Sequence, residues 1–160
     1  MNKLIHYTNE KFSLEPRKYD QAECFWQAKP NGLWISVAGE DDWENWCKSE
    51  GFNLENLAIS YEIKIKKDAH ILHLKTAQEI RDFSMLYILP TRYWDSDSDT
   101  YQIKWDKVKE KYQAIIISPY QWSCRLALET CWYYGWDCAS GCIWDLDCIE
   151  EFKLMETNKD

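Results

Sequence analysis

The chain is patterned as short strands mixed with short helices. Alternating or wholly apolar runs predict about six strands, at residues 3–8, 32–38, 57–65, 69–74, 113–118 and 140–146. Apolar positions three and four residues apart predict helices between them, at residues 41–52, 76–89, 103–112 and 121–134. We find no internal repeat and no linker-like tract. This order therefore predicts one α+β domain over residues 1–160.

The stretch from residue 29 to residue 47 is dense in tryptophan and carboxylate. Trp34 falls in a predicted strand after a Pro-Asn-Gly turn, and Trp43 and Trp46 fall on one face of the next predicted helix. The acidic residues at 40–44 suit the start of that helix, where they oppose its macrodipole. Two interpretations stay open at this point. The indoles either pack in the core or wall a pocket for a flat aromatic ligand.

Composition narrows the classes of partner. Ten Trp and ten Tyr stand against five Phe, and Trp and Tyr combine a stacking face with a polar group that suits a lined cleft. The net charge is −8 and the lysine runs at 64–67 and 107–111 are short, so the chain carries no strong sign of nucleic-acid binding. Because no apolar run is long enough for a membrane span, we expect no membrane partner.

Cysteine use indicates a reducing compartment. The seven cysteines are an odd number, and the first residues contain no apolar run of the kind that a secretory signal peptide needs. We therefore expect free thiols and a cytoplasmic location. A structural zinc site at the cysteine-rich end, 124–148, is an alternative, but the spacing offers no Cys-x-x-Cys pair and no nearby His. The Asp-rich loop at 94–100 lacks the Gly and Glu of an EF-hand, so we expect no metal.

Three features, taken in order, resemble a known family. His6 and Thr8 end the first predicted strand, the run Gly-Leu-Trp-Ile at 32–35 opens the second, and Trp-Cys at 46–47 follows on a helix. This order resembles the NAD-binding half of ADP-ribosyltransferases of the diphtheria-toxin and poly(ADP-ribose)-polymerase type. The run at 111–118 resembles the second half of that fold. The chain looks like a divergent, viral or bacterial branch of the superfamily.

The resemblance implies a fold and a set of ligand contacts. The fold would be split, small antiparallel sheets with flanking helices around a cleft for NAD, which is the substrate. His6 would hydrogen-bond the adenosine ribose, and the Gly32 backbone would approach the nicotinamide amide. Trp34 and Trp46 would flank the nicotinamide ring. The other residues that the resemblance places against the nucleotide are Tyr7, Thr8, Leu33, Ser36 and, as an anchor for the diphosphate, Arg125.

The sequence departs from the family at the catalytic carboxylate. The family's last strand begins with a Glu that holds the nicotinamide ribose and stabilises the positive charge as the glycosidic bond breaks. Aligning that pattern on the run SGCIWD puts Ser140 at the position of the Glu. Asp137, in the preceding turn, and Glu129, on the preceding predicted helix, are the nearest carboxylates that could replace it.

Two functions follow from the resemblance. The first is an NAD-dependent transferase, a glycosyltransferase in chemical class, that transfers ADP-ribose to an acceptor, which we expect to be a protein. The second is a non-catalytic module of the same fold that binds a nucleotide or a partner protein. A viral inhibitor that acts through its acidic surface would be of this second kind, because a negative field steers association with a basic partner.

Overall fold

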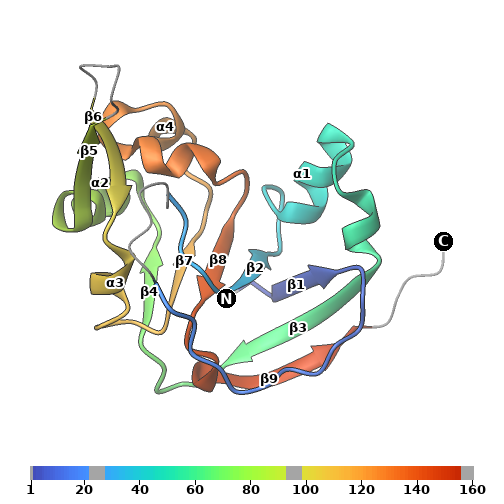
Figure 1. Cartoon of the computed structure of the whole chain (residues 1–160). Helices are drawn as coiled ribbons and strands as arrows, with labels where there is room; N and C mark the ends of the chain where they lie inside the picture. Colours follow the sequence, from blue (N-terminus) through green and yellow to red (C-terminus); the bar gives the residue numbers. More distant parts are fainter. Residues whose placement is uncertain (1, 22–27, 93–98, 156–160) are drawn as a thin grey trace.

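The structure is a computed structural model that describes residues 2–21, 28–92 and 99–155 (Figure 1). Its strands are β1 (Leu4–Thr8), β2 (Leu33–Val37), β3 (Ile59–Ile65), β4 (Ile71–Leu74), β5 (Ile88–Arg92), β6 (Asp99–Ile103), β7 (Ala114–Ile117), β8 (Ser140–Ile143) and β9 (Ile149–Leu154). Seven of them form one mixed sheet in the order β4-β7-β8-β2-β1-β3-β9, and β5 pairs with β6 separately. In the large sheet β4 and β7 run parallel, and the other neighbours are antiparallel.

The helices stand in two groups on either side of β2 and β8 (Figure 1). The helical segments are α1 (Trp43–Glu50), α2 (Ala77–Tyr87), α3 (Trp105–Val108) and α4 (Trp122–Arg125), with 3-10 turns η1 (Leu54–Leu57), η2 (Leu128–Gly135) and η3 (Leu146–Cys148). One group, α2 to α4 with η2, lies beside β4 and β7. The other group, α1 and η1, rises beside β1. The predicted α+β class is confirmed.

The large sheet almost divides between β1 and β2. β1 pairs with β3 along its whole length, but it pairs with β2 only at Leu4 and Ile5. The two strands then diverge, so residues 6–8 and residues 33–35 share no ladder. The structure therefore differs from the predicted split antiparallel sheets: seven strands form one curled mixed sheet with a narrow junction between its two halves, and β5 and β6 pair apart from it.

The core is built on central strands and on tryptophan. β7 and β8 are buried at every position, which is the pattern of strands covered on both faces. Beside them, Trp105, Trp132, Trp136 and Trp144 are at most 3% exposed. Trp132 contacts both Trp105 and Trp136 edge-on, in the geometry that aromatic pairs favour. These four indoles belong to the core cluster, and one of them, Trp136, also borders a cavity.

Helix predictions succeeded where caps are present and failed elsewhere. The predicted helix at 41–52 is α1: the Asp42 side chain accepts a hydrogen bond from the Asn45 amide, and Gly51 ends the helix with a φ of 62°. The helix predicted at 121–134 is instead α4 and η2. The chain leaves the helix at Leu126 and Ala127 between these two segments. Thr130, inside η2, has a non-helical φ of −125°, and its hydroxyl donates to the carbonyl of Cys124.

Candidate functional site

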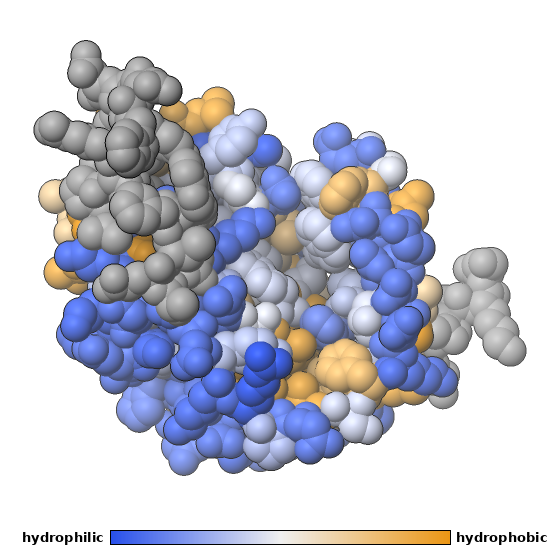
Figure 2. All heavy atoms as spheres, in the orientation of Figure 1, coloured by the Kyte–Doolittle hydropathy of each residue, from blue (hydrophilic) through white to orange (hydrophobic). Residues whose placement is uncertain are grey.

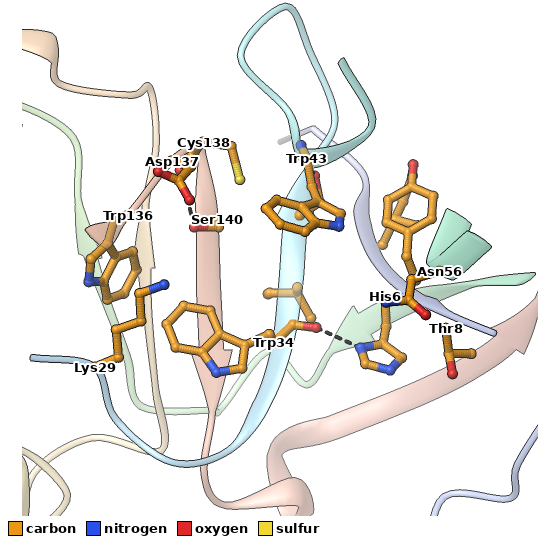
Figure 3. Close-up of a pocket in the computed structure, with 14 residues that line it drawn as sticks. His6, Thr8, Lys29, Trp34, Trp43, Asn56, Trp136, Asp137, Cys138 and Ser140 are labelled. Carbon is orange, nitrogen blue, oxygen red and sulfur yellow. Dashed lines mark hydrogen bonds between the residues drawn. The ribbon is translucent and has the colours of Figure 1, made fainter. Parts of the chain in front are cut away.

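A cavity of about 490 Å³ opens where β1 and β2 diverge. Figure 2 shows the hollow between the two halves of the molecule, and Figure 3 shows the side chains around it. The sequence-predicted site residues that line it are His6, Tyr7, Thr8, Trp34, Ser36, Asp137 and Ser140. They come from three segments that are far apart in the chain. The unfinished β1–β2 ladder brings them together, because a fully paired sheet would leave no opening there.

His6 joins the two diverging strands through its side chain. Its Nδ1 lies 2.7 Å from the backbone oxygen of Trp34 (Figure 3). A carbonyl can only accept, so Nδ1 carries the proton and the neutral ring keeps Nε2 as an acceptor. Burial lowers the pKa of His6, and this outweighs the opposite effect of the Trp34 carbonyl. The imidazole is therefore neutral near neutral pH and can accept a hydrogen bond from a ligand hydroxyl.

The lowered pKa of His6 predicts a pH-dependent stability. Below about pH 6.5 the unfolded chain takes up a proton at this residue before the folded one does, so the free energy of unfolding should decrease as pH falls. Above that pH the effect should vanish. Urea unfolding between about pH 7 and about pH 5 should show a shallower decrease in His6→Gln than in the wild type. Parallel pH profiles for the two proteins would contradict this prediction.

Two indoles line the cavity beside Trp34, and neither is Trp46. Trp43, the first residue of α1, and Trp136, just after η2, both line it. Trp34 packs edge-on against Trp136, with ring centroids 5.0 Å apart. Trp46 stacks on Trp43 at 5.1 Å and contacts Phe52 edge-on. The residues that were expected to form a Trp34–Trp46 sandwich are thus separated by Trp43.

Asp137 is the predicted carboxylate that reaches the cavity. It lies 3.7 Å from the guanidinium of Arg125, which also lies over the ring of Tyr134 at 5.3 Å from its centroid. Arg125 does not line the cavity, so the structure gives it Asp137 as a partner and leaves the expected diphosphate contact without support. Glu129 is exposed and also lies outside the lining.

Ser140 stands at the start of β8, the position at which the resemblance would place a Glu. The residue is buried, and its hydroxyl donates to the backbone oxygen of Cys138 at 3.1 Å. It therefore contributes a neutral, already bonded group to the cavity wall. Cys138 beside it is also neutral, because burial raises the pKa of its thiol to about 12. A thiol held in this state is a poor nucleophile.

Gly32 and Leu33 do not line the cavity. Leu33 is buried in the core. A Cβ on Gly32 would collide with the backbone oxygen of Ile143 and would lie 2.7 Å from Sγ of Cys142. The need for glycine here therefore comes from close packing of the chain against β8.

Sequence analysis missed several cavity residues. Lys29 lines the cavity and places its ammonium 5.5 Å from the ring centroid of Trp34. Asn56 reaches it from η1. Tyr7, which was expected to contact the nucleotide, donates its hydroxyl to Glu44 at 3.3 Å; burial, together with the charge of Glu44, raises its pKa. The proximity of Trp136 to Asp137 in the sequence was the one signal that could have identified that indole.

Within the described residues, no group of three or more His, Cys, Asp or Glu side chains is placed to hold a metal ion. The Asp-rich loop at 94–100 lies mostly outside the described residues, as does Cys24. In the part of the chain that the structure describes, no helix has the length and apolar character to cross a membrane. Comparisons with protein-family models, curated proteins and solved structures find no match to this chain.

Proposed function

We propose that the cavity binds NAD and that the chain is an ADP-ribosyltransferase-like protein. One observation carries the proposal: His6, Trp34 and Asp137, which the sequence places in three distant segments, line a single cavity. Together they offer a hydrogen-bond acceptor, an aromatic face and a carboxylate. An NAD molecule needs each of these around its riboses, its nicotinamide ring and its glycosidic bond.

The size and chemistry of the cavity suit a nucleotide. Its volume of about 490 Å³ lies within the range of about 300–1,000 Å³ that is usual for small-molecule sites. Trp34 and Trp43 present indole rings to the cavity for the nicotinamide ring, and His6 can accept a hydrogen bond from a ribose hydroxyl at Nε2. Lys29 supplies a cation for the diphosphate, a role that the resemblance had given to Arg125.

Asp137 is the residue that we assign to the chemical step. As the bond from the ribose anomeric carbon to nicotinamide breaks, nicotinamide leaves with the electron pair and positive charge develops on the sugar. A carboxylate beside that charge stabilises the transition state. The acceptor then forms a bond to the anomeric carbon and loses a proton. Arg125, at 3.7 Å, holds the Asp137 carboxylate in place for this role.

The second candidate function is nucleotide binding without turnover. Two contacts favour it: the hydroxyl of Ser140 is engaged by Cys138, and the carboxylate of Asp137 is shared with Arg125. Neither group is left wholly free to stabilise a cationic sugar. A module of this kind would hold NAD or a related nucleotide, or present its acidic surface to a partner protein, with no release of nicotinamide.

Calorimetric titration with NAD, combined with chromatographic measurement of released nicotinamide, tests the proposal. We expect saturable binding that weakens about tenfold or more in His6→Ala. This variant loses the proposed hydrogen bond from a ribose hydroxyl to Nε2 and the contact of Nδ1 with the Trp34 carbonyl between β1 and β2. His70→Ala is the matched control, since His70 is exposed and outside this cavity. Binding without nicotinamide release would select the second candidate, and no binding at about 1 mM NAD would exclude the transferase and the NAD-binding form of the second candidate.

A further inference from the structure

Exposed apolar side chains stand on both sides of the cavity. One side of the cavity mouth, which we call the α1–η1 lip, is formed by residues 40–57, which include the turn before α1. Its Phe52 and Leu54 side chains are 49% and 51% exposed. The other side, which we call the α4–η2 lip, is formed by residues 122–135. Its exposed large apolar residues are Trp122, Leu126, Leu128 and Tyr134. Each lip continues directly into the cavity wall, because η1 contributes Asn56 and the end of η2 is followed by Trp136 and Asp137. Figure 1 shows α1 and α4, the helices of the two lips, on opposite sides of β2 and β8, and Figure 2 shows the hollow between the two halves of the molecule.

Three of the lip side chains pack against neighbours within the protein. Trp122 packs edge-on against Tyr120 with centroids 4.7 Å apart, and the Tyr134 ring lies under the guanidinium of Arg125. Phe52 contacts Trp46. These side chains are held in place without being covered. Ordered apolar groups gathered around a cavity mouth are typical of a surface that a partner covers.

The charge of the α1–η1 lip limits the class of partner. Six carboxylates and one lysine lie between residues 39 and 58, and that lysine, Lys48, is already paired with Glu44 at 2.8 Å. With a net charge of −8 for the chain, the surface repels a nucleic-acid phosphate backbone. It attracts a positively charged protein segment and speeds its association.

We propose that the acceptor is a protein segment in which an apolar side chain is flanked by Lys or Arg, and that it docks across the two lips. The apolar part of the segment contacts Leu126 and Leu128 on one side and Phe52 and Leu54 on the other, and the basic residues face the carboxylates of the α1–η1 lip. The transfer of ADP-ribose to this segment rests on the proposed function. The docking itself does not, because it uses residues outside the cavity.

Binding of three labelled synthetic peptides, measured by fluorescence anisotropy without NAD, tests the docking. The first alternates Lys with Leu and Phe, the second replaces every Lys by Glu, and the third replaces every apolar residue by Ser. We expect the first to bind at least about tenfold more tightly than the other two. Equal binding of all three, or tighter binding of a mixed-sequence oligonucleotide, would overturn the proposal.

Paired substitutions locate the surface. Leu126→Ser with Leu128→Ser, and Phe52→Ser with Leu54→Ser, should each weaken binding of the basic apolar peptide about tenfold. Met85→Ser with Leu86→Ser is the matched control, because these side chains are 74% and 77% exposed on α2, away from the cavity mouth (Figure 1). Circular dichroism of each variant checks folding. Equal losses in all three pairs would overturn the assignment to the lips.

The same peptides separate this inference from the proposed function. Peptide binding with no nicotinamide release from NAD would leave the docking surface standing and remove the transferase. Nicotinamide release with no preference among the three peptides would support the transferase and remove the docking surface. If both hold, mass spectrometry should find an ADP-ribose adduct on the basic apolar peptide and none on the Glu-substituted one.

Discussion

Replacing Asp137 with Asn should lower nicotinamide release from NAD by about 100-fold or more and change NAD affinity only a few-fold. The amide keeps the size of the side chain but removes the negative charge that stabilises the cationic sugar. Asp137 is the described carboxylate that lines the cavity, so no neighbour in the lining can replace its charge. Single-turnover release of nicotinamide, with NAD binding measured by calorimetry, separates the chemical step from binding.

Glu129→Gln is the matched control for Asp137→Asn. Glu129 was an equal candidate from sequence, yet its side chain is exposed and lies outside the cavity lining. Its removal should leave nicotinamide release unchanged. A large loss in Glu129→Gln, or full activity in Asp137→Asn, would show that the carboxylate assignment is wrong.

The sequence identified several of the residues that line the cavity because strand ends and turns are visible in the residue pattern. His6 was recognised at the end of a β-prone run and Trp34 just after a Pro-Asn-Gly turn, and both line the cavity. The choice among the indoles failed for a physical reason. Trp43 and Trp46 share a helix face by spacing, but spacing does not show that they stack on each other, which leaves Trp43 at the cavity and Trp46 behind it.

The strands that the sequence did not predict are those whose pairing partners lie in other segments of the chain. β9 is an edge strand whose residues are at most half-buried, so its run of mixed polarity gave a weak strand signal. The β5–β6 pair was read as parts of neighbouring helices and a loop, since pairing partners cannot be seen in either segment alone. The junction between β1 and β2 is likewise a property of two strands together, and it decides where the cavity opens.

Replacing Gly32 with Ala should destabilise the protein by about 2–4 kcal/mol. The added methyl group would collide with the backbone oxygen of Ile143 and crowd Sγ of Cys142. A backbone oxygen cannot move aside as a flexible side chain can, so the strain falls on the start of β2 and its pairing with β8. Urea unfolding followed by tryptophan fluorescence gives the change in free energy of unfolding.

Gly51→Ala separates packing from backbone strain. Gly51 has a φ of +62° and nothing within 4 Å of an added Cβ, so its substitution should cost only about 1 kcal/mol of stability.

The resemblance had assigned Gly32 to the nicotinamide amide, and that role predicts the opposite outcome for Gly32→Ala: near-normal stability with NAD binding lost. Because Gly32 lies outside the cavity lining, we expect the folded fraction of Gly32→Ala to bind NAD with wild-type affinity. Loss of affinity at unchanged stability would return Gly32 to the site.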